Sequence, residues 1–417
     1  MAFNITGSPF AKRSRLRIPL MVLSLSALVA GLWAGLLRIG WQIPSISTQV
    51  LLEHGPLMVA GFLGTLISLE RAVALSQLQH GRRIYYLVPL LAGLGGVALF
   101  FPVPIFVPHL LITLAALGFL IIFIIIYRLQ PATHSAVMGL GVFLWLVGNA
   151  LWMAGLPVFR VAPWWAAFLV LTIAGERLEL TRVLVLTKTV RTLFLVITGI
   201  VLVGLFVSLA AFDAGVRIAG FGLAALGVWL FRYDIARHTI RQQGLTRYIA
   251  ACLLPGYLWL TLGGVLWMIF GGSYPAGSIY DAMLHTIFIG FVFSMIFGHA
   301  PVIIPAVMGV PIKYLSVFYV HLSLLHLSLA LRIAGDLLLS QSIRRWGAVQ
   351  RGGGHFVLSC DRDLGAQGDE QQQIVKRHPQ GEIGGLLVVR CNLWYPLGLF
   401  LPSSNERISS CISRQPT

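Results

Sequence analysis

Histidine is the residue type whose positions in this chain most suggest chemistry. Eleven histidines are present, and five lie inside long apolar stretches: His54, His285, His299, His321 and His326. An imidazole inside a membrane-type segment usually faces the protein interior or water and has a partner there, so each is a candidate functional group. Neutral imidazole is also the commonest side-chain ligand for metals.

A pair of these histidines on different helices could hold haem. His54 lies in an early apolar stretch and His326 in a late one, and two neutral imidazoles can ligate a haem iron from its two faces. His54 and His326 are therefore the predicted ligands of a b-type haem. His321 is a further cofactor-binding candidate, but five residues of helix turn it about 140° from His326, so the two face different neighbours.

His285 and His299 are predicted to serve other sites. Fourteen residues separate them, which places them on nearly the same helix face but about 21 Å apart, too far to share a metal ion. His285, with His321, is a candidate for a second metal near the outer face. His299 is a metal-ligand candidate or a proton relay on the inner side. Asp281 precedes His285 by four residues and could orient its ring as behind a metal ligand, or form a simple hydrogen-bonded pair with it.

Charged residues gather at the predicted inner ends of two segments. The segment "LERA" supplies Glu70 and Arg71, and "AGERLELTRVL" supplies Glu176, Arg177 and Glu179. These side chains are expected to pair across helices as structural ion pairs. The alternatives are a proton entry path or a clamp for haem propionates.

The elements that carry these residues are predicted to be transmembrane helices. The chain is 57% hydrophobic and 11% charged, and its mean hydropathy is +0.85, outside the range of water-soluble domains. About 20 apolar residues cross a bilayer as a helix. The predicted fold is an all-α, polytopic transmembrane bundle of eleven spans, near 18–41, 47–75, 84–103, 105–127, 133–155, 162–180, 191–212, 214–231, 247–271, 279–305 and 313–335.

Basic residues fall mostly in alternate loops and in the N-terminal tail. Because cytoplasmic loops retain Lys and Arg, the N-terminus is predicted to be cytoplasmic and the protein to lie in the inner (plasma) membrane. The net charge of +16 is then explained by helix ends that meet anionic lipid. No soluble basic face for nucleic acid is found, so the predicted partner is the lipid bilayer.

Three regions are predicted along the chain. Residues 1–17 form a basic cytoplasmic tail, residues 18–338 the transmembrane bundle, and residues 339–417 a non-membrane tail. Eleven spans would end outside, yet the charges from residue 361 to 370 prevent that stretch from crossing lipid as a twelfth span. The tail is either disordered or a frameshifted reading of a lost last helix. Its three cysteines match no metal or redox spacing.

Three short stretches resemble known membrane haem proteins. "HGPLMVAGF" at 54–62 resembles the helix of haem-copper oxidase catalytic subunits that supplies a low-spin haem ligand. Together with "HTIFIGF" and "GHAPVIIP", it resembles still more closely the NnrS-type membrane proteins, which are associated with haem, copper and nitric oxide stress. The resemblance covers roughly residues 18–336. It implies a protein that senses, binds or detoxifies nitric oxide or another small diatomic, with a redox partner as a further expectation.

A secondary transporter is the competing prediction. Buried histidines and charges could bind protons and an anionic solute where helices are broken, and the prolines and glycines of "GHAPVIIPAVMG" favour such a break. No phosphate-binding glycine loop, H-E-x-x-H or C-x-x-C-H motif is present, which disfavours an ATP-driven pump, a zinc protease and a c-type cytochrome.

Overall fold

The structure is a computed structural model of the whole chain that describes residues 9–44, 52–184, 186–309 and 312–352. All of its regular elements in these ranges are helices. In chain order they are α1 (Pro9–Arg38), α2 (His54–Pro56), η3 (Leu57–Gly64), α3 (Thr65–Leu78), η4 (Ile84–Tyr86), α4 (Leu87–Ala98), α5 (Phe106–Leu129), α6 (Thr133–Met153), α7 (Val158–Leu180), η5 (Thr181–Leu184), α8 (Lys188–Ala210), α9 (Phe212–Tyr233), α10 (Ala236–Thr239), α11 (Gly244–Phe270), α12 (Gly277–His285), η6 (Thr286–Phe293), α13 (Ser294–Met308) and α14 (Phe318–Gly352).

The predicted all-α transmembrane fold is confirmed. Ten helices in the described ranges are long and apolar enough to cross a membrane. The predicted span near 84–103 forms a shorter apolar helix, Ile84–Ala98. The protein is therefore a multi-pass membrane protein, in which backbone hydrogen bonds are satisfied within each helix.

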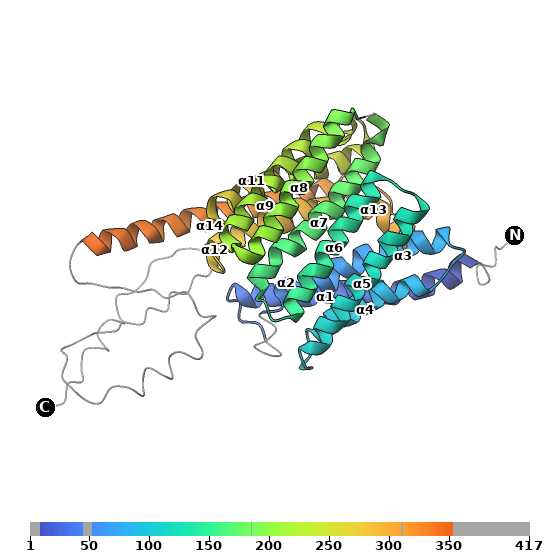
Figure 1. The fold of residues 1–417 in the computed structure, drawn as a ribbon, viewed down its shortest axis with the longest axis horizontal. Coiled ribbons are helices and arrows are strands. Elements are labelled where there is room, and N and C mark those ends of the chain that lie inside the picture. The colour runs from blue at the N-terminus through green and yellow to red at the C-terminus, as the bar shows by residue number, and fades with distance from the viewer. Residues whose placement is uncertain (1–8, 45–51, 185, 310–311, 353–417) are drawn as a thin grey trace. The chain divides into compact units, whose positions relative to one another are not determined.

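Helix α7 is the most buried of the span-length helices. Of its most apolar window, 83% is buried against other helices, compared with 17% for α14. Neighbours in sequence pack side by side from α4 through α5 and α6 to α7, and from α8 through α9 to α11 (Figure 1). Side chains on all sides of α7, such as Trp164, Trp165 and Phe168, are consequently fully enclosed.

Early and late helices meet on one side of the bundle. The helix that comprises α2, η3 and α3 packs on α1 and α4, and α13 packs on both α1 and α3. Figure 1 shows α13, drawn in orange, beside α3, drawn in blue. Segments from the two ends of the membrane domain are thereby brought into contact.

The C-terminal region begins with a helix that extends past the predicted last span. α14 continues to Gly352, whereas the apolar pattern stops near residue 338. The chain divides into two compact units, residues 1–347 and 348–417, and the packing reported below belongs to the first. Residues 353–417, which include most of the predicted disordered or frameshifted tail, lie outside the described residues.

Candidate functional site

The two candidate histidines whose rings the fold brings close together are His54 and His285. His54 is the first residue of α2 and His285 the last residue of α12. The centroids of their rings are 6.4 Å apart, and the ring planes differ by 33°. The predicted partner of His54 was His326, and the structure places His285 beside it instead.

Nδ1 of each ring lies within hydrogen-bond distance of an oxygen acceptor. Nδ1–H of His54 donates to the carbonyl oxygen of Gly31 at 2.7 Å. Nδ1–H of His285 lies 2.9 Å from the carbonyl oxygen of Asp281 and 3.0 Å from its carboxylate Oδ1. Because these oxygens can only accept, both Nδ1 atoms carry the hydrogen in the neutral rings. The free lone pair is therefore on Nε2 of each ring, as in a histidine prepared to ligate a metal.

Both histidines precede a segment of π-helix. Leu57–Gly64 follows His54, and Thr286–Phe293 begins directly after His285. Phe62 and Phe293 also pair, with ring centroids 6.2 Å apart, and each lies eight residues after its histidine. The two helices thus run parallel and in register. Local π-helices are rare and frequently occur at functional sites.

The start of α2 explains how His54 reaches this position. Pro56 lies in the first helical turn, where its missing N–H costs no hydrogen bond. Gly35 of α1 leaves room for the ring, because a Cβ at this glycine would lie 3.0 Å from Cε1 and Nδ1 of His54. The helix was predicted to start near residue 47, with His54 about two turns inside it. The described helix begins at His54.

Asp281 is fixed by a side chain from α14. Its Oδ2 accepts hydrogen bonds from Nη2 and Nε of Arg332 at 2.6 Å and 2.8 Å. Nε of Arg332 also lies 3.9 Å from Oδ2 of Asp336. The predicted contact between Asp281 and His285 is present, and it belongs to a chain of charged groups that joins α12 to α14.

The two candidate histidines of α14 have other surroundings. Nδ1 of His326 accepts a hydrogen bond from Nε1–H of Trp259 at 3.0 Å. In the neutral ring the hydrogen is therefore on Nε2, which leaves no free lone pair for a metal. His321 is exposed, and the structure shows no contact between His321 and His285 that would form the predicted second metal site.

His299, in the first half of α13, takes part in a buried ionic cluster. Its Nδ1–H donates to the carbonyl oxygen of Met295 at 2.6 Å, and its Nε2 lies 3.4 Å from Nη1 of Arg177. Arg177 pairs with Asp234 through Nε–Oδ2 at 2.9 Å and Nη2–Oδ1 at 3.1 Å. Since the lone pair of His299 faces a guanidinium, this arrangement gives it the role of a hydrogen-bond acceptor.

The remaining predicted charged residues pair across helices. Arg71 of α3 forms an ion pair with Glu176 of α7, and Glu70 lies 3.8 Å from the same guanidinium. Glu179 lies 3.7 Å from Nε2 of His134 on α6. These charged side chains are paired with one another and join α3, α6 and α7. This arrangement agrees with the expectation of structural ion pairs.

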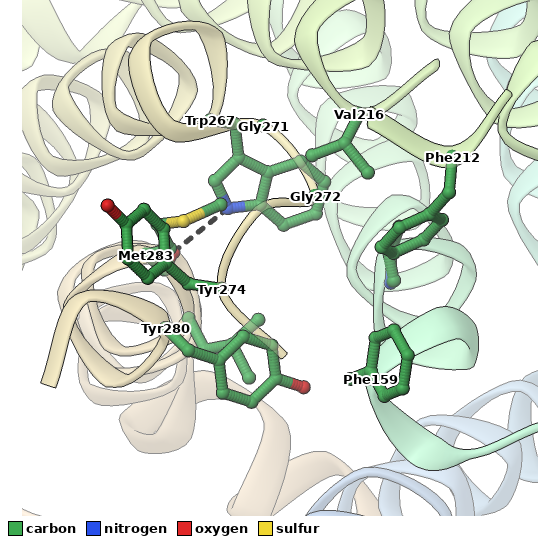
Figure 2. A pocket seen from close by; sticks show the side chains of 11 residues that line it. Phe159, Phe212, Val216, Trp267, Gly271, Gly272, Tyr274, Tyr280 and Met283 are labelled. Carbon is green, nitrogen blue, oxygen red and sulfur yellow. Dashed lines mark hydrogen bonds between the residues drawn. The ribbon is translucent and has the colours of Figure 1, made fainter. Parts of the chain in front are cut away.

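An apolar hollow lies on another face of α12. Aromatic rings of Phe159, Phe212, Trp267 and Tyr280 surround it, and Nε1–H of Trp267 donates to the carbonyl oxygen of Met283 at 3.1 Å (Figure 2). At about 100° of rotation per helical residue, Tyr280 and Met283 point away from the side of α12 that carries His285. The hollow is thus separate from the pair of rings.

The sequence analysis did not identify three residues that lie near the pair of rings. Gly31 acts through its carbonyl oxygen, which no sequence pattern reports. Arg332 is 51 residues from Asp281 in the sequence, so no local spacing reports their contact. Glu53 precedes His54, its buried Oε2 has no hydrogen-bond partner among the described residues, and burial raises the pKa of its carboxyl group to about 7.

A comparison with known proteins shows which family the chain belongs to. A family model described as "Domain of unknown function (DUF8744)" matches residues 17–354. The chain belongs to this family. The match begins within α1 and extends past the end of α14, and it therefore includes both His54 and His285. No curated protein and no solved structure matches the chain.

Proposed function

We propose that this member of the DUF8744 family is a membrane haem protein that holds one b-type haem between His54 and His285. The observation that carries the proposal is the pair of neighbouring rings, with centroids 6.4 Å apart and both Nδ1–H groups already donated. Two imidazole nitrogens that bind one metal from opposite sides place their ring centroids about 6 Å apart, since each metal–nitrogen distance is about 2 Å.

Haem fits this pair of ligands better than a bare metal ion does. Within the described ranges no three His, Cys, Asp or Glu side chains gather as a metal-binding group. A copper or zinc ion prefers three or four protein ligands, whereas haem brings four nitrogens of its own and needs only axial ligands. Copper remains the alternative that metal analysis would reveal.

Haem held by His54 and His285 would supply a reversible one-electron couple and a binding place for nitric oxide or another small diatomic. The protein's part is to orient two imidazoles through Gly31 and Asp281 and to exclude water with apolar rings such as Phe62 and Phe293. With both imidazoles in place, electron exchange with a redox partner is the favoured role. A response to a diatomic then requires that one imidazole leaves.

The proposal is tested by the visible spectrum of the purified protein and three histidine variants. We expect the wild-type protein to show a Soret band of a six-coordinate haem. Neither His54→Ala nor His285→Ala should show this six-coordinate spectrum, because each variant lacks one of the two imidazole ligands. His326→Ala is the matched control and should keep the wild-type spectrum.

A colourless wild-type protein after expression with excess haem would refute the proposal. Loss of the band in His326→Ala, with retention in His285→Ala, would instead restore the ligand pair predicted from the sequence. Metal analysis of the same samples separates iron from copper.

Secondary transport is the second candidate, and the buried cluster of Arg177, Asp234 and His299 favours it. An ion pair inside a membrane domain is expensive and is often functional. Here both carboxylate oxygens of Asp234 are paired with Arg177, so the cluster offers a solute little unpaired charge. Uptake of a labelled anion into proteoliposomes, abolished by His299→Ala, would support transport over haem binding.

A further inference from the structure

The two facing histidines differ in the acceptor that each uses. His54 donates to a neutral backbone carbonyl, that of Gly31. His285 donates to a backbone carbonyl and also to the carboxylate of Asp281. A carboxylate behind a ligating histidine raises the basicity of the other ring nitrogen and so strengthens its bond to a metal.

The carboxylate of Asp281 is held for this task. Arg332 donates two hydrogen bonds to Oδ2 and leaves Oδ1 for the ring of His285. Asp336 places a second carboxylate at 3.9 Å from Nε of the same guanidinium. Two carboxylates therefore lie beside one guanidinium, and the two hydrogen bonds from Arg332 fix the position of the Asp281 carboxylate.

The backbones of the two histidines also differ in freedom. His285 lies inside the continuous helix Gly277–Met308, whereas His54 is the first residue of the helix His54–Leu78. The residue before it, Glu53, makes no side-chain capping bond. Movement of His54 breaks fewer backbone hydrogen bonds than movement of His285, because the first residues of a helix donate none within it.

We propose that His285 is the permanent ligand of the site and His54 the exchangeable one, so that a small neutral diatomic enters at the position that His54 vacates. The proposal rests on the proposed function, since it assigns unequal roles to the same two ligands. It makes Asp281 and Arg332 positioning residues, which act on the cofactor only through His285.

The test uses the full-length protein in detergent with carbon monoxide as the probe. We expect reduced His54→Ala, supplied with haem, to keep one axial ligand and to bind carbon monoxide at least about tenfold faster than wild type, because no imidazole has to leave. His285→Ala should lose most of its haem. His54→Gln, which retains the side-chain size, replaces His54→Ala if truncation impairs folding.

A spectroscopic signature separates a ligand-tuning role of Asp281 from a purely structural one. In His54→Ala the iron–histidine stretching frequency reports His285 alone, and we expect it to fall when Asp281→Asn is added. Asp213→Asn, which alters an exposed ion pair with Arg217, is the matched control and should leave the frequency unchanged.

Three outcomes are distinguishable. If wild type binds haem but His285→Ala keeps it while His54→Ala loses it, the assignment of roles is wrong. An unchanged iron–histidine frequency in the double variant also overturns the inference. If wild type binds no haem at all, the proposed function fails and not merely this assignment.

Discussion

At the scale of single residues, the group beside Nδ1 distinguishes histidines that look alike in the sequence. An acceptor at Nδ1 leaves the lone pair of His54 and His285 on Nε2. A donor at Nδ1, the indole of Trp259, has the opposite effect on His326. The side chain that can ligate a metal is therefore decided by the hydrogen bond at Nδ1, made to another helix by His54 and His326 and to its own helix by His285, and not by depth in the membrane.

Gly35 tests whether the position of His54 matters. We expect Gly35→Ala to displace the imidazole, because the added Cβ would lie 3.0 Å from two ring atoms. Overpacking of this kind typically costs about 1–3 kcal/mol in free energy of unfolding. The haem content and the temperature of thermal unfolding, measured on the same samples, should both fall.

Gly199→Ala is the matched control for that substitution. Gly199 also lies in a transmembrane helix, and a Cβ there meets no atom within 4 Å. It should leave the haem content unchanged and can slightly stabilise α8, since alanine favours helix over glycine by about 0.5–1 kcal/mol. Equal losses in the two variants would contradict the role given to Gly35.

At the scale of elements, hydropathy was sufficient to locate the helices but not their local geometry. The segments 57–64 and 286–293 are almost wholly apolar, so their composition is the same for α-helix and π-helix. The pairing of His54 with His285 was missed for a related reason: helix neighbours depend on packing over the whole bundle. Local spacing did suffice for Asp281 and His285, which are one helical turn apart.

The buried pair of Arg177 and Asp234 joins α7 to the end of α9. We expect Asp234→Asn to lower the free energy of unfolding by about 3–5 kcal/mol, because it leaves a buried guanidinium without its counter-charge. Thermal unfolding in detergent measures the change. Asp213→Asn, at an exposed ion pair, should have little effect on the free energy of unfolding. A similar loss in both variants would show that burial does not determine how much the ion pair contributes to stability.

At the scale of the whole molecule, the distribution of basic residues predicts the orientation in the membrane. Arg82 and Arg83 follow α3, while the connection after α4, which includes Val103, carries no basic residue. Because positive charge is retained on the cytoplasmic side, we infer that α1 runs from inside to outside. The His54 and His285 pair would then lie nearer the outer surface and the Arg177 cluster nearer the inner one.

Single cysteines test this orientation. In a background without the four native cysteines, Val103→Cys should react with a membrane-impermeant maleimide in intact cells, and Arg82→Cys only after lysis. Both positions are exposed, so a difference in labelling reports the side of the membrane. The reverse pattern would invert the assigned topology and the placement of the proposed haem.

The distance in sequence between the facing rings has a consequence for biosynthesis. His54 leaves the ribosome with the second helix, and His285 follows only after most of the membrane domain has been made. If the proposed haem binds between these rings, the early helices must therefore enter the lipid before the haem can be captured. Under haem starvation, newly made chains would accumulate as inserted but immature protein, and their maturation would then depend on haem supply and no longer on translation.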